Sequence, residues 1–146
     1  MKDITKQPGY LFHNVRLLKA YYQLMHPNPL PINIETKFDY GDELRIDGNI
    51  LYVQQSGKIV ISTKDSPPKD ILSLEIVIEG TFEAIPPVNI SLDEFGKRHA
   101  IAILFPYLRE FISRFTSNMG NIPSIVLPPF NVLAMKESRS AEQKQI

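Results

Sequence analysis

The chain has 146 residues, with sixteen basic and sixteen acidic residues and a hydrophobic fraction of 43%. This composition fits one globular domain, and the balanced charge excludes bulk attraction to nucleic acid or to an anionic membrane. Cysteine is absent, which excludes disulfides and thiolate chemistry. Because the sequence has neither a secretion signal nor a stretch near the roughly 18 apolar residues of a membrane span, we expect a cytoplasmic protein that does not insert into membranes.

The N-terminal part of the chain predicts two strands. Residues 15–26 contain Tyr21 and Tyr22, which favour extended structure, and several prolines follow at once. Residues 32–38 alternate apolar and polar side chains with a period of two, which is typical of a half-buried strand.

Two further strands are predicted before the first helix. Ser56-Gly57 is interpreted as a break, so a third strand is expected over residues 58–63. Residues 71–85 have the clearest strand pattern, with one continuous apolar face. The residues of that face are Leu72, Leu74, Ile76 and Ile78. Because short turns and no crossover helix separate the four strands, we predict a mainly antiparallel meander.

Helical patterns follow the last strand. Ser91 and Glu94 have the spacing of a capping box, which predicts a helix start. Apolar residues then recur every three or four positions until Ser117, which predicts one long amphipathic helix. Pro106 lies inside that pattern, where it lacks an N–H donor, so we expect a kink or a restart near Phe105.

The remaining sequence completes the predicted architecture. Residues 122–135 are apolar but rich in proline, which predicts an extended segment that ends in a short helical turn. The fold class is therefore α+β, with a four-stranded antiparallel sheet followed by a long kinked helix and this segment. We expect one domain over residues 1–135 and a disordered tail over residues 136–146.

The residues that could carry chemistry form no recognised catalytic or metal-binding pattern. The three histidines lack the short spacing of a zinc site, and the isolated glycines form no phosphate loop, so we expect no cofactor. Glu75, Glu79 and Glu83 alternate on one strand face, which fits either paired catalytic acids or, as we favour, a solvated sheet face. We therefore expect a protein that is not an enzyme.

Two segments in the C-terminal half resemble the SecB protein-export chaperones. The first has a phenylalanine-proline-tyrosine sequence followed by arginine-glutamate, and the second has a proline-asparagine sequence. The residues that match are Phe105, Pro106, Tyr107, Arg109, Glu110, Pro129 and Asn131. The pair of segments at this separation is fairly specific, and we interpret its residues as holding the fold rather than as forming a binding site.

This resemblance implies an ATP-independent holdase that binds unfolded or precursor polypeptides in apolar grooves. It also implies a homotetramer built as a dimer of dimers. The subunit contact of the family corresponds to Leu74, Ile76 and Ile78, although an ordinary sheet core explains these residues equally well. Export members dock on the translocase motor SecA through acidic side chains, and Glu75 is the residue that matches one of them.

Candidate client contacts lie near the end of the first predicted strand. Aromatic and methionine side chains adapt to varied partners, so this stretch could bind unfolded chains without strict sequence preference. The candidates are Tyr21, Tyr22, Leu24, Met25 and Leu30. Each of them could instead belong to the core, which is the interpretation that we favour.

The balanced charge departs from the strongly acidic character of export chaperones and leaves two alternatives open. The first is a SecB-like chaperone dedicated to one partner, such as the cognate antitoxin of a toxin-antitoxin pair. The second is a small-ligand-binding or enzymatic domain on the same fold, which a deep closed pocket with converging polar groups would favour.

Overall fold

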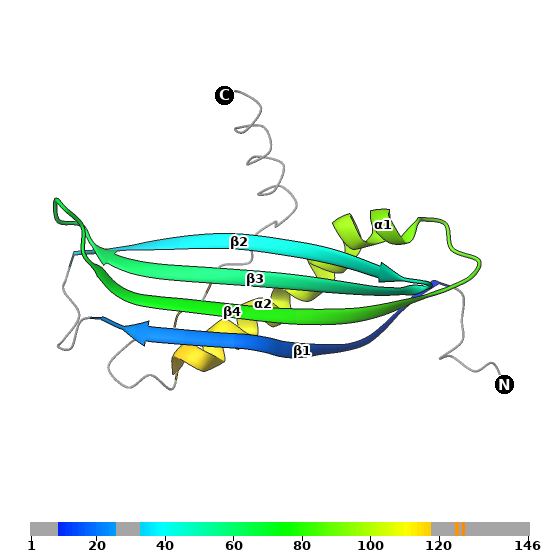
Figure 1. Ribbon diagram of the computed structural model, residues 1–146, viewed down its shortest axis with the longest axis horizontal. Coiled ribbons are helices and arrows are strands. Elements are labelled where there is room, and N and C mark those ends of the chain that lie inside the picture. The colour runs from blue at the N-terminus through cyan, green and yellow to red at the C-terminus, as the bar shows by residue number, and fades with distance from the viewer. Residues whose placement is uncertain (1–8, 26–32, 118–124, 126, 128–146) are drawn as a thin grey trace, which may run out of the picture.

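The computed structural model describes residues 9–25 and 33–117, together with residues 125 and 127. Four long strands form one antiparallel sheet, and a helical segment that follows them covers one face (Figure 1). The strands are β1 (Gly9–Leu24), β2 (Ile34–Asp47), β3 (Ile50–Thr63) and β4 (Asp70–Ile85), and the helical elements are α1 (Leu92–Phe95), the π-helical turn η2 (Gly96–Ala100) and α2 (Ile101–Ser117). The predicted α+β class is confirmed.

The strand order differs from a simple meander. The order across the sheet is β1-β4-β3-β2, and each pair of neighbours is antiparallel. Consecutive strands are neighbours from β2 to β4, but β1 pairs with β4, so β1 and β2 form opposite edges. The prediction of a full meander was wrong because local turn patterns contain no information about this non-local pairing.

Strand β3 continues through the position where a break was predicted. Gly57 pairs with Tyr40 on one side and with Ile76 on the other. A Cβ atom at Gly57 would lie 3.1 Å from the Ile112 Cδ1 atom, which belongs to α2. The glycine is therefore needed for the close approach of the helix to the sheet, and it does not end the strand.

The face of the sheet beneath α2 forms the core. The predicted apolar face of β4 is confirmed, because Leu72, Leu74, Ile76 and Ile78 are almost completely buried. Leu104, Leu108 and Ile112 of α2 are likewise buried. Every second residue of β4 and every third or fourth residue of α2 therefore point into the same core, as the periods of a strand and of a helix predict.

The start of the helical segment matches the prediction, but its irregularity lies elsewhere. The Ser91 hydroxyl accepts a hydrogen bond from the Glu94 backbone N–H at 3.2 Å, which satisfies one donor of the first turn. Pro106 lies inside α2, which continues from Ile101 without a restart near Phe105. The non-α geometry occurs one turn earlier, in η2. The proline is accommodated because the carbonyl it leaves without a donor, that of Ala102, belongs to an exposed residue.

Two residues of the proline-rich segment lie within the described part of the chain. The Ile125 backbone N–H donates a hydrogen bond to the Thr116 hydroxyl at 2.8 Å, and Leu127 is buried against the core. The rest of the predicted extended segment and the predicted tail over residues 136–146 lie outside the described residues. Within the described part of the chain, no helix is long and apolar enough to cross a membrane.

Candidate functional site

The edge strand β1 exposes large apolar side chains. Their exposed fractions lie between 41% and 46%. The residues are Leu17, Leu18, Tyr21, Leu24 and Met25. Isolated exposed leucines are ordinary on protein surfaces, but five such residues lie within positions 17–25, four of them in β1 and Met25 just after it, and they border both faces of the sheet edge. We call these five residues the β1 row.

The β1 row includes most of the client contacts predicted from the sequence. Tyr21, Leu24 and Met25 are exposed, as a contact surface requires, although no measurement of binding tests this role. Tyr22 instead faces α2, where its ring lies 6.2 Å from the ring of Phe115. Leu30 lies outside the described residues. Sequence reasoning missed Leu17 and Leu18, because alternation alone would bury one of two adjacent leucines.

The two edges of the sheet differ in chemistry. Among the described strands, no strand pairs with the outer side of β1 or of β2. Strand β2 carries alternating charges, a common protection against the addition of foreign strands, whereas β1 carries the β1 row. The charged residues of β2 are Glu35, Lys37, Asp39, Asp42, Glu43, Arg45 and Asp47. The β1 edge therefore lacks the alternating charges that protect β2, and its protection is limited to the irregular stretch before Lys19.

Two irregularities in β1 organise the face of the sheet that points away from α2. The β1–β4 register shifts between Phe12 and Asn14 and again between Leu17 and Lys19. Each shift adds one residue to β1, so that basic side chains spaced by three residues all reach the same face. A strict period of two could not place them there. The basic residues are His13, Arg16 and Lys19.

These bases pair with the three glutamates of β4. His13 Nε2 lies 2.8 Å from Glu83 Oε1, Arg16 Nη2 lies 2.8 Å from Glu79 Oε1, and Lys19 Nζ lies 2.7 Å from Glu75 Oε1. We call these three contacts the ion-pair ladder. The carboxylates share one sheet face, but the favoured interpretation of a solvated face was wrong for Glu79, which is buried, and sequence reasoning missed the three partners. The equal spacing of the three bases was the available signal.

The central pair of the ladder is the most buried. The Glu79 side chain is only 5% exposed, whereas that of Arg16 is 63% exposed. Glu79 Oε2 also accepts a hydrogen bond of 3.3 Å from Gln54 Nε2 on β3. The Glu79 carboxylate therefore joins β1, β4 and β3, and its low exposure makes both partners important for stability.

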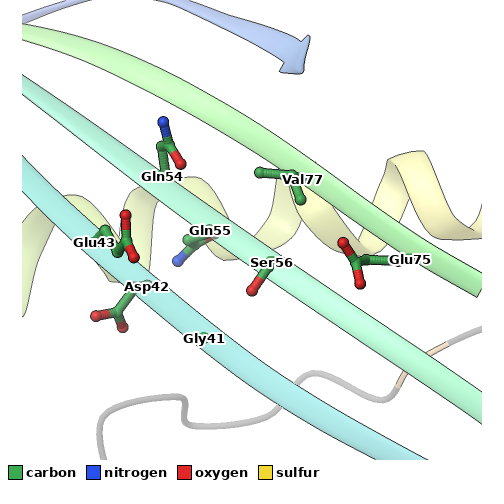
Figure 2. A pocket seen from close by; sticks show the side chains of 8 residues that line it. All are labelled: Gly41, Asp42, Glu43, Gln54, Gln55, Ser56, Glu75 and Val77. Atoms are coloured by element: carbon green, nitrogen blue, oxygen red, sulfur yellow. The ribbon is translucent and has the colours of Figure 1, made fainter. Parts of the chain in front are cut away.

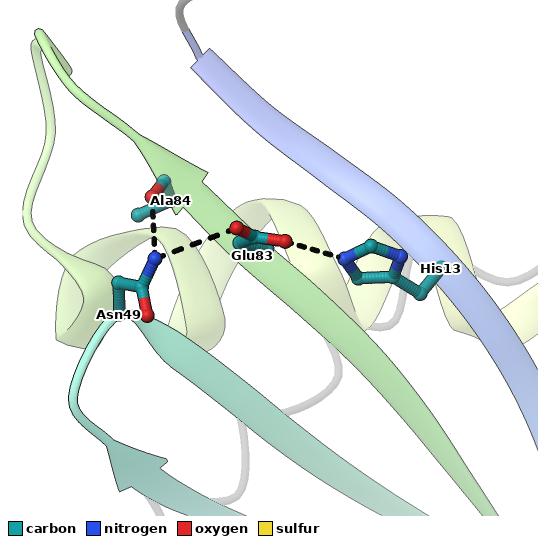
Figure 3. Close-up of polar contacts among 4 residues, drawn as sticks. All are labelled: His13, Asn49, Glu83 and Ala84. Atoms are coloured by element: carbon teal, nitrogen blue, oxygen red, sulfur yellow. Dashed lines mark hydrogen bonds and ion pairs between the residues drawn. The ribbon is translucent and has the colours of Figure 1, made fainter. Parts of the chain in front are cut away.

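The end of the ladder joins β1 to the turn between β2 and β3. Figure 3 shows the Glu83 carboxylate between the His13 ring and the Asn49 side chain. Asn49 Nδ2 donates to the Ala84 carbonyl at 3.3 Å and to Glu83 Oε2 at 3.5 Å. These contacts fix the N-terminal part of β1 beside the hairpin, so the exposed β1 row extends from an anchored end.

The residues that the resemblance assigned to a subunit contact lie inside the single chain. Leu74, Ile76 and Ile78 face α2, and their exposed fractions are 0%, 1% and 0%. These three residues belong to the core of the sheet, as the alternative interpretation from the sequence proposed. Their side chains leave no surface for another subunit, because the helix of the same chain already covers them.

Glu75 and the residues of the resembling helix segment have distinct environments. Glu75, the proposed docking residue, is engaged by Lys19. Phe105 is buried, with its ring 6.1 Å from that of Tyr40, and Tyr107 is 41% exposed, with its ring 5.7 Å from that of Phe12.

The other resembling positions lie on the helix surface or beyond the described chain. Pro106 is exposed and Arg109 is half-buried. Glu110 Oε1 accepts a hydrogen bond of 2.6 Å from Arg114 Nε one turn later, which also forms an ion pair. Pro129 and Asn131 lie outside the described residues. Phe105 and Tyr107 therefore act in packing, and Glu110 supports the helix.

A shallow depression of about 310 Å³ lies on the sheet, across β2, β3 and β4 (Figure 2). Its lining residues are Gly41, Asp42, Glu43, Gln54, Gln55, Ser56, Glu75 and Val77. It is not the deep closed pocket that would favour a small-ligand domain. Within the described part of the chain, no group of three or more histidines and carboxylates could hold a metal ion.

A buried polar network fixes the helical segment over the sheet. Gln55 Nε2 donates to the Tyr40 hydroxyl at 2.9 Å and to the Ile101 carbonyl at 2.8 Å. Burial raises the pKa of Tyr40, and the nearby Asp42 carboxylate raises it further, while the hydrogen bond from Gln55 acts in the opposite direction. The network is structural, because it lies beneath α2 and away from the β1 row.

Comparison with known proteins identifies the fold. No known family model matches the sequence. An uncharacterized protein of Methanocaldococcus jannaschii is 38% identical over 78 residues, which are 53% of this chain and 50% of that protein. The chain thus spans about half the length of this curated relative.

The structural relatives are more informative. The Mycobacterium tuberculosis SecB-like chaperone, in complex with a ChAD peptide from the HigA1 antitoxin, matches with a TM-score of 0.71 and 16% identity, over 84% of this chain and 91% of that one. A protein of unknown function from Streptococcus agalactiae matches with a TM-score of 0.48 and 14% identity, over 82% and 97% of the two chains. The first match shows that this chain has a SecB-like fold.

Proposed function

We propose that this protein is an ATP-independent chaperone that binds an unfolded or extended polypeptide segment along β1. The observation that carries the proposal is the β1 row, which exposes four large apolar side chains on an edge strand and that of Met25 directly after it. Unpaired backbone groups and adaptable apolar side chains are the features that strand-addition binding uses. Such binding delays aggregation by mass action and requires no covalent chemistry.

The SecB-like fold supports this proposal by analogy. The mycobacterial protein with this fold was solved with an antitoxin peptide bound. Fold alone does not determine function, so the exposed surface of this chain carries more weight than the likeness. Both observations favour a polypeptide as the ligand.

Among chaperone roles, we favour a dedicated partner over general export. Docking on a translocase motor such as SecA would use acidic side chains, but Lys19 neutralises Glu75, and the chain has no net charge. A cognate antitoxin is one partner of this kind. Binding of the purified motor protein to this chain, abolished by Glu75→Gln, would instead support a role in export.

A homotetramer remains part of the proposal. Leu74, Ile76 and Ile78 are unsuitable for it, so we assign the contact to exposed apolar residues of α2, namely Ile103 and Tyr107. Light scattering at micromolar concentration tests this assignment. The expected mass is four times 16.7 kDa and should decrease in an Ile103→Lys variant, and a monomeric wild-type protein would contradict the proposal.

The holdase proposal is tested by aggregation without nucleotide. A chemically unfolded model protein is diluted into buffer with or without this chain, and light scattering is recorded. We expect suppression near stoichiometric ratios and its loss in a Leu17→Ser, Leu24→Ser variant. A matched Ile46→Ser variant changes an equally exposed apolar residue on β2 and should retain activity. Absence of suppression by the wild-type protein would contradict the general holdase role.

A further inference from the structure

We propose that the second bulge of β1 moves between two positions, so that Leu17 and Leu18 exchange their roles in the strand. In the arrangement described above, Leu17 stands opposite Ile78 and Leu18 is the extra residue. In the other arrangement, Leu18 stands opposite Ile78 and Leu17 is the extra residue. This inference goes beyond the proposed function, because it concerns the strand itself and holds whatever the β1 row binds.

The bulges correct the phase of the apolar pattern of β1. On the face covered by the helical segment, β1 presents only apolar and aromatic side chains, although their spacing departs twice from a period of two. These residues are Tyr10, Phe12, Val15, Leu17, Ala20, Tyr22 and Leu24. Each departure contains one extra residue, which is His13 in the first bulge and Leu18 in the second. The pattern thus requires an extra residue in both places, but it does not determine which of two neighbours is the extra one.

Chemistry fixes the extra residue of the first bulge. His13 forms an ion pair with Glu83 across the open face of the sheet. Phe12, the residue before it, lies on the opposite face, where its ring stacks on that of the buried Phe82 with 4.9 Å between the ring centroids. An exchange of these two neighbours would break the ion pair and bring an imidazole against the core, so the first bulge has one favoured position.

The second bulge lacks this chemical distinction, because its two neighbours are both leucines. The exposed fractions of the Leu17 and Leu18 side chains are 44% and 43%, so each buries about the same apolar area. Hydrophobic stabilisation is roughly proportional to the apolar area buried. An exchange of the two leucines leaves that area nearly unchanged, so the two arrangements have similar free energies.

The exchange is confined to these two residues. On either side of the bulge, Arg16 and Lys19 keep their partners on β4 in both arrangements. Their ion pairs with β4, of 2.8 Å and 2.7 Å, hold the flanking stretches of the strand in place. Only the backbone at Leu17 and Leu18 changes, and Ile78 exchanges one cross-strand neighbour for the next. A change this local requires no opening of the sheet.

Nuclear magnetic resonance of the intact, deuterated wild-type protein tests the exchange directly. Relaxation dispersion detects exchange on the microsecond to millisecond scale, on which rearrangements of packed elements occur. We expect exchange at the backbone amides of Leu17, Leu18 and Ile78, with the two arrangements differing about tenfold or less in population. Tyr21 and Tyr22 are a second pair of identical neighbours in β1, but they lie in a regular stretch. Their amides should show no such exchange.

Two variants should each select one arrangement. A lysine is better solvated as the extra residue at the edge than on the face that α2 covers. In Leu18→Lys, nuclear Overhauser contacts between backbone protons should therefore join Ile78 to residue 17. In Leu17→Lys, they should join Ile78 to residue 18. Leu17→Gln makes the same comparison without a charge if the lysine variant does not fold.

The matched control is Tyr22→Lys. Tyr22 stands opposite Leu74 in the regular stretch, where no bulge can absorb a shift, so this variant should keep its register and lose stability. If position 17 remains opposite Ile78 in both Leu17→Lys and Leu17→Gln, the inference is overturned. Wild-type resonances of Ile78 that match those of Leu18→Lys, without exchange, would overturn it as well. Either result leaves the proposed chaperone function intact, because aggregation assays test that function separately.

Discussion

Replacement of Gly80 by alanine tests how closely α2 packs on the sheet. A Cβ atom at this position would lie 2.8 Å from Leu104 Cδ1 and 3.0 Å from Leu104 Cγ, with Cδ2 nearer still. Carbon atoms pack comfortably at about 3.5–4.0 Å, so the new methyl group overlaps its neighbour by most of an ångström. Leu104 is completely buried and cannot move into solvent.

The expected cost follows from these contacts. Overpacking of this kind costs about 1–3 kcal/mol, and the reduced freedom of the unfolded chain offsets about 0.4–1 kcal/mol. Gly80→Ala should therefore lower the free energy of unfolding by about 1–2 kcal/mol, measured by urea denaturation with an unchanged slope. Gly41→Ala is the control, because its Cβ would meet only the Ser56 hydroxyl, at 2.8 Å, and that group can rotate away.

A double-mutant cycle identifies the cause of the loss. Leu104→Ala alone should cost about 2–5 kcal/mol through the cavity that it leaves. In that background the methyl group of Gly80→Ala has space, so its cost should vanish or change sign. An equal cost of Gly80→Ala in both backgrounds would refute the reasoning. A Leu104→Val background provides the same comparison with a smaller loss of stability.

Three further predictions follow from single side chains. Arg16→Met should cost about 1–2 kcal/mol in urea denaturation because Glu79 loses its ionic partner, and adding Glu79→Gln should restore much of that loss. The pKa of Tyr40 is raised above its ordinary value, so above about pH 10 Tyr40 ionises only in the unfolded state and the free energy of unfolding should fall. Tyr40→Phe should make this decline shallower, by up to about 1.4 kcal/mol per pH unit. Pro106→Ala restores a donor for the Ala102 carbonyl inside α2 and should stabilise the protein by about 1–2 kcal/mol, seen as a higher Tm; a lower Tm would show that the proline is needed there.

The parts of the fold that were predictable from the sequence depend on local patterns. Alternation identified the buried face of β4, and the spacing of Ser91 and Glu94 identified the helix start. Such patterns report which side of an element is buried, but they do not report which element covers it. This is why Leu74 and Ile76 fitted both a core and a subunit contact until the position of α2 was known.

The candidate site was less predictable because it depends on non-local pairing. The core interpretation that the sequence favoured was wrong for Tyr21 and Leu24, which are exposed, whereas Tyr22 faces the helix because strand neighbours alternate. Gly57 was interpreted as a break because glycine is typical of turns. Glycine is also required where a helix packs closely on a strand, and the sequence alone does not distinguish the two cases. The ion-pair ladder was missed because bulges place Arg16 and the other bases on one face in a pattern that a regular strand cannot produce.

The most direct test of the central claim is hydrogen exchange of the backbone amides, measured with and without a permanently unfolded client protein. The account predicts slower exchange along β1, centred on residues 15–24, with little change in β2. The folded form of the same client should have no effect. Unchanged exchange in β1, or protection confined to other elements, would contradict the proposal that this strand binds unfolded polypeptides.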